Sequence, residues 1–197
     1  MDERVSQLQR DYIGRRGHAV ATLARLRRGV GKPPGATAGL WEATLEGVPL
    51  PARYGDEPTS NEWATYAAVT LFAIHQQSQG TPMHEPGRGL GKAVRMLCTR
   101  NAAAGRSQDA VRRRFEALGT ATDFAEVVHH ARGLIGQLRT FGIPLDYGRL
   151  AEDFVWLQRP QGADRVRLAW GRDFYSEDHE SGETPVDDTG KEARGSE

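Results

Sequence analysis

Residues 122–140 read TDFAEVVHHARGLIGQLRT, the longest regular run in the chain. Its large apolar side chains recur at spacings of four, three, four and three residues, at Phe124, Val128, Ala131, Ile135 and Leu138. This spacing puts them on one stripe of an α-helix, a pattern typical of helices that pack in bundles. Thr122 is predicted to cap the helix, and Gly142 and Pro144 to end it. The run predicts a packed helix as a main element of the fold.

A second strong helix is predicted to open at Thr59 and to run to Gln79, apolar from Trp63 onward. Residues 59–62, TSNE, have the form of a capping box, in which a Thr hydroxyl and a Glu carboxylate satisfy free backbone N–H groups. The helix that follows is apolar on most of its faces, and Trp63 and Phe72 are among its aromatic residues. Because a helix with this pattern is buried on all sides, we expect it at the centre of the molecule.

Shorter helical patterns lie around these two, at residues 5–28, 41–45, 90–101, 108–118 and 146–158. Gly14 and Gly17 weaken the middle of the first, each by about 1 kcal/mol relative to Ala. Residues 166–170, VRLAW, alternate in polarity, which predicts a short strand or an extended segment. Since nearly all regular segments are helical with short connections, the predicted fold class is all-α, a helical bundle.

The formal net charge of zero hides an uneven distribution of sign. The 197 residues hold 26 Lys and Arg against 26 Asp and Glu. Residues 1–172 carry 24 basic and 17 acidic side chains, whereas residues 173–197 carry 2 and 9. Segment 176–197 is polar and acidic, which predicts a disordered tail. We expect this tail either to screen the basic body or to act as a solubilising extension.

Two clusters hold much of the positive charge. Residues 1–35 carry 8 basic and 3 acidic side chains, and residues 88–114 carry 8 and 1. One carboxylate among 27 residues leaves few local ion-pair partners, so these clusters favour a surface that binds phosphates. Arg also outnumbers Lys by 23 to 3, and its planar guanidinium suits phosphate oxygens.

Several classes of function find no support in the sequence. No apolar run approaches the roughly 20 residues of a membrane span, and the absence of a signal-peptide pattern together with the single Cys98 favours the cytoplasm. The Gly-rich residues 87–92 lack the first Gly and the final Ser/Thr of a nucleotide-binding P-loop. The adjacent His129 and His130 face different sides of one helix. We therefore predict no enzyme activity, no cofactor and no metal.

Four stretches of the sequence together resemble a known family. They are residues 23–29 with the Gly/Pro loop up to Trp41, residues 71–77 with 91–95, residues 113–118, and residues 134–150 with Trp156. In their order and spacing over about residues 16–175, they are similar to CasB, the small subunit of the type I-E CRISPR surveillance complex, Cascade. The acidic tail lies outside the resemblance.

The resemblance implies an all-α protein in two small lobes, placed here at residues 1–101 and 102–175, ahead of the tail. It implies a non-catalytic subunit in antiviral defence that helps hold the guide RNA–target DNA heteroduplex and the displaced strand of the R-loop. The implied partners are guide RNA, target DNA, the filament-backbone and large subunits, and a second copy of the chain. The predicted nucleic-acid contacts are Arg27, Arg28, Lys32, Arg95, Arg100, Arg112, Arg113 and Arg139.

Two other classes of function stay open on the sequence. A helical adaptor would use the same basic surface to bind an acidic protein partner. A nuclease would need clustered carboxylates to hold a divalent metal, and no such cluster is visible in the sequence.

Overall fold

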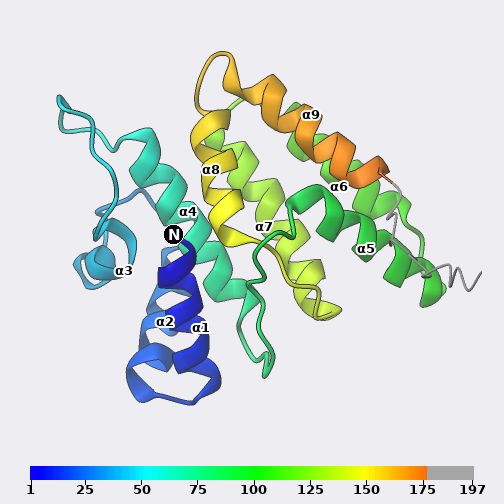
Figure 1. The fold of residues 1–197 in the computed structure, drawn as a ribbon, viewed down its shortest axis with the longest axis horizontal. Coiled ribbons are helices and arrows are strands. Elements are labelled where there is room, and N and C mark those ends of the chain that lie inside the picture. Colours follow the sequence, from blue (N-terminus) through cyan, green and yellow to red (C-terminus); the bar gives the residue numbers. More distant parts are fainter. Residues whose placement is uncertain (177–197) are drawn as a thin grey trace, which may run out of the picture.

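The computed structural model describes residues 1–176 as a bundle of helices (Figure 1). These are α1 (Asp2–Ile13), α2 (Gly17–Gly29), the short 3-10 helix η1 (Ala38–Leu40), α3 (Trp41–Leu45), α4 (Ser60–His75), α5 (Leu90–Ala103), α6 (Asp109–Thr120), α7 (Phe124–Thr140), α8 (Tyr147–Leu157) and α9 (Gly162–Tyr175). The predicted all-α fold is confirmed. None of the helices described is long and apolar enough to cross a membrane.

Helix α4 lies at the centre of the bundle and packs against α2, α3, α7 and α8. Its start carries the predicted capping box: the Glu62 N–H donates to Thr59 Oγ1 at 3.3 Å, and the Thr59 N–H donates to Glu62 Oε2 at 2.7 Å. Ala68, Leu71 and Phe72 are fully buried. The prediction of a central, buried helix is therefore confirmed.

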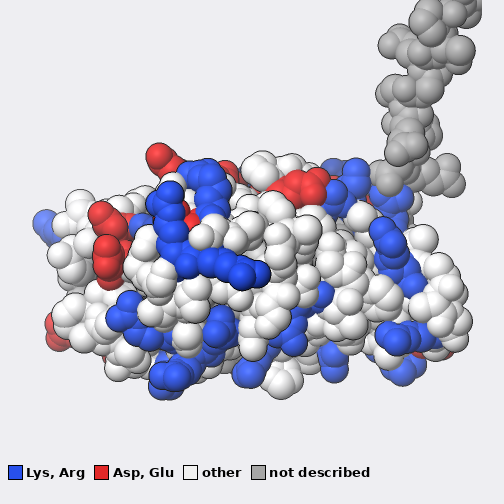
Figure 2. All heavy atoms as spheres, turned by 90° about the horizontal axis from the view of Figure 1, so that it is seen from below, with Lys and Arg blue, Asp and Glu red and all other residues white. Residues whose placement is uncertain are grey.

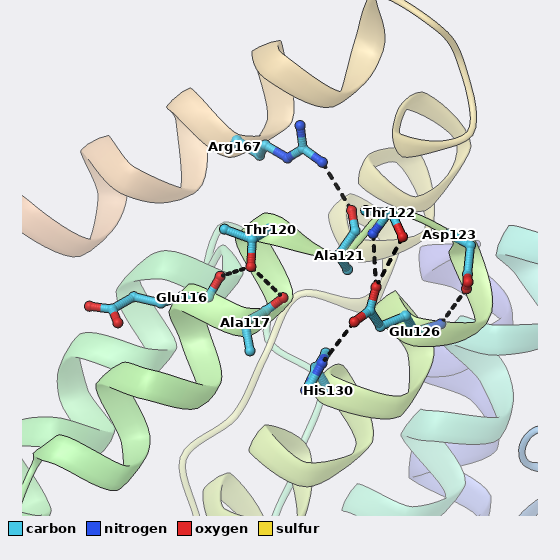
Figure 3. A network of polar contacts seen from close by, with 9 residues as sticks. All are labelled: Glu116, Ala117, Thr120, Ala121, Thr122, Asp123, Glu126, His130 and Arg167. Atoms are coloured by element: carbon cyan, nitrogen blue, oxygen red, sulfur yellow. Dashed lines mark hydrogen bonds and ion pairs between the residues drawn. The ribbon is translucent and has the colours of Figure 1, made fainter.

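Helix α7 carries the predicted apolar stripe, but it begins one residue later than predicted. Asp123, not Thr122, is the N-cap, because its carboxylate accepts a hydrogen bond from the Glu126 N–H at 2.8 Å. The Thr122 N–H donates to the Glu126 carboxylate at 2.8 Å instead (Figure 3). Arg167 of α9 donates to the Ala121 carbonyl at 3.1 Å, which ties the α6–α7 connection to the last helix.

The prediction of one helix over residues 5–28 is wrong, because the chain forms two helices, α1 and α2, that pack against each other. Between them Arg15 takes a left-handed φ of 55°. The turn is held by Asp11, whose carboxylate lies 3.1 Å from Arg16 Nη1 and 3.2 Å from His18 Nε2. The two glycines of this segment weaken a continuous helix, so packing between two short helices prevails over it.

The prediction of a strand or extended segment at residues 166–170 is also wrong, because these residues lie within α9. Val166, Trp170 and Phe174 recur every four residues and are buried. Leu168, which made the pattern look alternating, is 54% exposed. The three buried residues lie four positions apart and form one stripe of a helix. When α9 packs against α5 and α8, burial of this stripe prevails over the strand-like alternation.

Helices before and after residue 101 pack against each other. Helix α4 packs on α8, and α5 packs on α9. The division into lobes at residues 1–101 and 102–175 stays a prediction. The predicted disordered tail at residues 176–197 lies, from residue 177 onward, outside the described residues.

Candidate nucleic-acid interface

The two basic clusters lie toward opposite ends of the long axis of the molecule, one at α2 and one at α5 and α6 (Figure 1). Figure 2 shows Lys and Arg side chains spread along one face from end to end, with fewer Asp and Glu side chains among them. The cations that the sequence places in two separate stretches therefore occur on helices held within one bundle.

Three cations of the first cluster, Arg27, Arg28 and Lys32, lie at or just after the C-terminal end of α2, where cations interact favourably with the helix dipole. Tyr66 of α4 donates a hydrogen bond to the Gly29 carbonyl at 2.9 Å, and a Cβ at Gly29 would come within 2.6 Å of the Tyr66 hydroxyl. Glycine at this position therefore lets α2 end directly against α4. This contact fixes where Arg28 and Lys32 are presented.

The predicted contact residues of this cluster differ in accessibility. Arg28 and Lys32 are exposed, and their side chains make no hydrogen bond or ion pair within residues 1–176. Arg27 is half-buried, and its Nη1 is buried without a hydrogen-bond partner. Arg28 and Lys32 are thus the side chains that an external phosphate reaches without breaking an internal contact.

Two cations of the second cluster, Arg95 and Arg112, line a hollow of about 230 Å³ between α5, α6 and the end of α9. Arg112 donates to Gln108 Oε1 at 3.1 Å, and its guanidinium lies 5.3 Å from the centre of the Phe174 ring. Such stacking holds the guanidinium in place while leaving other N–H groups available. The structure therefore brings together two predicted contact residues that lie seventeen positions apart in the chain.

Arg100 and Arg113, also predicted contacts, are exposed on α5 and α6. Within the described part of the chain their side chains have no hydrogen-bond or ion-pair partner. Long exposed arginines without an internal partner can bind a phosphate without the cost of breaking a salt bridge.

Arg139 has an internal role in the structure. Its Nη1 donates to the Ile74 carbonyl at 3.4 Å and to Gln77 Oε1 at 3.1 Å. A cation at the last carbonyls of α4 interacts favourably with that end of the helix. Its predicted contact with nucleic acid stays a prediction, and the structure shows Arg139 holding α7 against the end of α4.

Three further arginines, which the sequence patterns did not single out, lie beside Lys32 or on an aromatic ring. Arg132 of α7 joins Lys32 at the rim of one cavity. Trp156 has the guanidinium of Arg159 at 4.5 Å and that of Arg165 at 5.0 Å from its ring centre. The spacing of tryptophan and arginine within residues 156–165 could have suggested the contacts of Arg159 and Arg165 with Trp156. Nothing near Lys32 in the sequence points to Arg132.

One group of potential metal ligands occurs within residues 1–176, formed by Asp2, His84 and Asp146. The Tyr147 N–H donates to His84 Nδ1 at 3.1 Å, so the ring proton of neutral His84 lies on Nε2, which faces Asp2 Oδ1 at 3.7 Å. A protonated nitrogen cannot bind a metal. The two Asp146 oxygens accept backbone N–H groups of Gly87 and Arg149 at 2.7 and 2.9 Å. These contacts give the group a structural role.

Comparison with known proteins identifies the family. The family model described as "CRISPR-associated protein Cse2" matches residues 22–175. The crystal structure of CasB from Thermobifida fusca is similar with a TM-score of 0.76 and 39% sequence identity, covering 89% of this chain and 95% of that one. No curated protein matches the chain. The chain therefore belongs to the Cse2 (CasB) family of CRISPR-associated proteins, which confirms the family predicted from its sequence and implies a subunit of a Cascade complex.

Proposed function

We propose that this protein is a non-catalytic subunit that stabilises the R-loop of a type I-E Cascade complex, through contacts of its basic surface with the sugar–phosphate backbone of nucleic acid. The observation that carries the proposal is the set of exposed cations without internal partners at both clusters, namely Arg28, Lys32, Arg100 and Arg113. The bound species are the guide RNA–target DNA heteroduplex and the displaced DNA strand.

Sequence recognition in such a complex is delegated to base pairing, and the protein contributes contacts that do not depend on sequence. Exchange of a DNA duplex for an RNA–DNA heteroduplex is close to balanced in free energy. A few cations that hold the displaced strand are therefore enough to shift the balance toward the open state. Two clusters at opposite ends of the bundle suit a strand that runs along the protein rather than one that ends in a pocket.

We further propose that a second copy of this chain, the filament-backbone subunits and the large subunit are its protein partners, and that it acts in the cytoplasm in antiviral defence. Copurification with a tagged filament subunit tests this assembly. The expected result is a complex that contains guide RNA and two copies of this chain. A chain that never copurifies with the filament would contradict the assembly.

The nucleic-acid contacts are tested by the salt dependence of binding to single-stranded DNA. For the full-length chain we expect the logarithm of affinity to fall linearly with the logarithm of salt concentration, with a slope of about −0.7 for each phosphate neutralised. Arg28→Gln, Arg100→Gln and Arg113→Gln should each make the slope shallower by about 0.7. Arg53→Gln, an exposed arginine outside both clusters, is the matched control and should leave the slope unchanged.

Two outcomes separate this proposal from its alternative, a helical adaptor for an acidic protein. Affinity that is flat between low and moderate salt rules out phosphate contacts. If Arg28→Gln lowers copurification with the filament after nuclease treatment, yet leaves DNA binding unchanged, that cation contacts protein. Retention of R-loop formation by a complex carrying all three substitutions would contradict the proposed role.

A further inference from the structure

A cavity of about 400 Å³ opens between the loop after α2 and helices α4 and α7. We call it the α4–α7 cavity. Its volume lies within the range of about 300–1,000 Å³ that is usual for sites that bind small molecules. Apolar and aromatic side chains form most of its wall, with Trp63 and Tyr66 from α4 and Phe124 and Val128 from α7. It is thus a largely apolar recess between α4 and α7.

The rim of this cavity carries positive charge without compensation. Lys32 and Arg132 supply this charge beside the ring of His129, and no Asp or Glu lines the cavity. All three are exposed, and within residues 1–176 their side chains make no ion pair or hydrogen bond. The nearest carboxylate along α7, Glu126, is held by Thr122 and does not line the cavity (Figure 3). An apolar recess with an uncompensated cationic rim fits a ligand that joins an apolar or aromatic body to an anion.

Two side chains of the wall, Trp63 and Gln158, also carry unused polar groups. Trp63 is half-buried and meets the Phe124 ring edge-on, with ring centres 6.3 Å apart, and its Nε1–H has no partner within the described chain. Gln158 donates from Nε2 to the Ser60 and Phe154 carbonyls at 3.0 and 2.9 Å. Its Oε1 is consequently oriented and accepts no hydrogen bond within residues 1–176. One unused donor and one unused acceptor therefore belong to the same recess.

We propose that the α4–α7 cavity binds one unpaired nucleotide of a single strand, a site that the backbone contacts above do not include. The base stacks in the aromatic recess with its polar edge toward Trp63 Nε1 and Gln158 Oε1, and the adjoining phosphates lie on Lys32 and Arg132. A planar ring that carries both donors and acceptors next to phosphates matches every feature of the wall and the rim. Paired and stacked bases of a duplex cannot enter, so the site selects single strand. The inference rests on the proposed nucleic-acid function and adds to it a contact with a base.

The test compares two ligands that carry the same phosphates. Fluorescence anisotropy measures binding of the full-length chain to a short single-stranded oligodeoxynucleotide and to the same oligomer in which every nucleotide is abasic. Stacking of a base on aromatic side chains strengthens binding by about fivefold or more. We therefore expect the natural oligomer to bind at least about fivefold more tightly than the abasic one.

Substitutions at the cavity test whether the preference for the natural oligomer arises there. Ala125 lines the cavity from an exposed position of α7, so Ala125→Trp should fill the recess without disturbing the core. For Ala125→Trp, the ratio of the affinity for the natural oligomer to that for the abasic oligomer should fall to about one, while the affinity for the abasic oligomer is unchanged. The matched control Ala125→Ser should keep the ratio of the native chain. Trp63→Phe, which keeps an aromatic ring but removes the N–H donor, should reduce the ratio in part. Arg132→Gln should weaken both oligomers equally, and Arg53→Gln, an exposed arginine outside both clusters, should weaken neither.

Each outcome bears on the inference. Equal affinities of the native chain for both oligomers would overturn the nucleotide site and leave the backbone contacts standing. A ratio that survives Ala125→Trp would show that bases are recognised elsewhere and would also overturn the site. If neither oligomer binds, the proposed nucleic-acid function falls together with this inference. If Ala125→Trp does not fold, the ratio for Trp63→Phe decides: an unchanged ratio overturns the site.

Discussion

Two titratable side chains, the buried His75 and the half-buried Asp153, have opposite effects on stability as pH changes. Burial raises the pKa of Asp153 to about 6, while its Oδ2 accepts the Trp170 Nε1–H at 2.7 Å. Burial lowers the pKa of His75 to about 3, and its Nδ1 lies 2.9 Å from the Tyr147 hydroxyl. The neutral His75 contributes stability that is fully present above its ordinary pKa and is lost as pH falls. The neutral Asp153 contributes stability that is fully present below its ordinary pKa and is lost as pH rises.

Replacing Asp153 by Asn should reveal this effect. Because the pKa of Asp153 in the folded protein lies above its ordinary value, the folded protein retains a proton that the unfolded chain loses as pH rises from about 4 to about 6. Ionisation of the buried carboxyl therefore costs up to about 3 kcal/mol of unfolding free energy at higher pH. Asp153→Asn cannot ionise, and its amide oxygen still accepts from Trp170. It should be more stable than the native chain at pH 8, with that advantage largely gone at pH 4.

Urea unfolding at the two pH values measures the difference. Asp164→Asn, which changes an exposed aspartate on α9, is the matched control and should alter the unfolding free energy by less than about 0.5 kcal/mol at either pH. An equal effect of Asp153→Asn at both pH values would contradict the argument.

Helix starts are decided by side chains within one turn of the chain, which explains why the sequence predicts them well. Thr59 caps α4 as predicted, and Asp146 caps α8 by accepting the Arg149 N–H at 2.9 Å. The cap of α7 moves only from Thr122 to Asp123, because both can accept hydrogen bonds there. Element type fails where the local pattern is ambiguous, as at residues 166–170, where a helical stripe and a strand-like alternation share the same apolar residues.

Removal of the α4 cap should cost measurable stability. Thr59→Ala takes away one half of the capping box on the central helix, for which we expect a loss of about 1 kcal/mol in unfolding free energy. Thr37→Ala provides a matched control, because Thr37 precedes η1 without making a side-chain cap hydrogen bond. Chemical denaturation should show a change for this control within about 0.5 kcal/mol. Equal losses for the two variants would mean that the capping box does not stabilise α4.

The molecule as a whole depends on close approaches between helices that are distant in sequence. A Cβ at Gly91 of α5 would collide with the Trp170 carbonyl of α9 and come within 2.8 Å of Asp173 Cβ. Arg149 Nη2 of α8 lies 2.8 Å from Asp173 Oδ2 and links a third helix to this junction. The second basic cluster rests on α5 and α6, so its position depends on this junction.

Two glycine substitutions should therefore have opposite effects. Gly91→Ala is expected to destabilise the protein by about 1–3 kcal/mol, because the added methyl forces α5 and α9 apart. Gly136→Ala in α7, where an added Cβ meets nothing within 4 Å, is expected to stabilise it by about 0.5–1 kcal/mol through helix propensity. Thermal or chemical unfolding measures both. Stabilisation by Gly91→Ala would contradict a close contact between α5 and α9 at this position.

The amino-acid order alone establishes the helical class, most helix boundaries, the central helix and the two basic clusters of this protein. Periodicity and capping depend on residues a turn apart, and a cluster of charge within one stretch needs no fold to be counted. The split of residues 5–28 into α1 and α2, the assignment of α9, the internal role of Arg139 and the α4–α7 cavity required the packed molecule. Lys32 and Arg132 line one cavity although a hundred residues separate them, because burial of α4 against α2 and α7 brings the loop after α2 close to α7. Such contacts between distant segments have no signature in either local sequence.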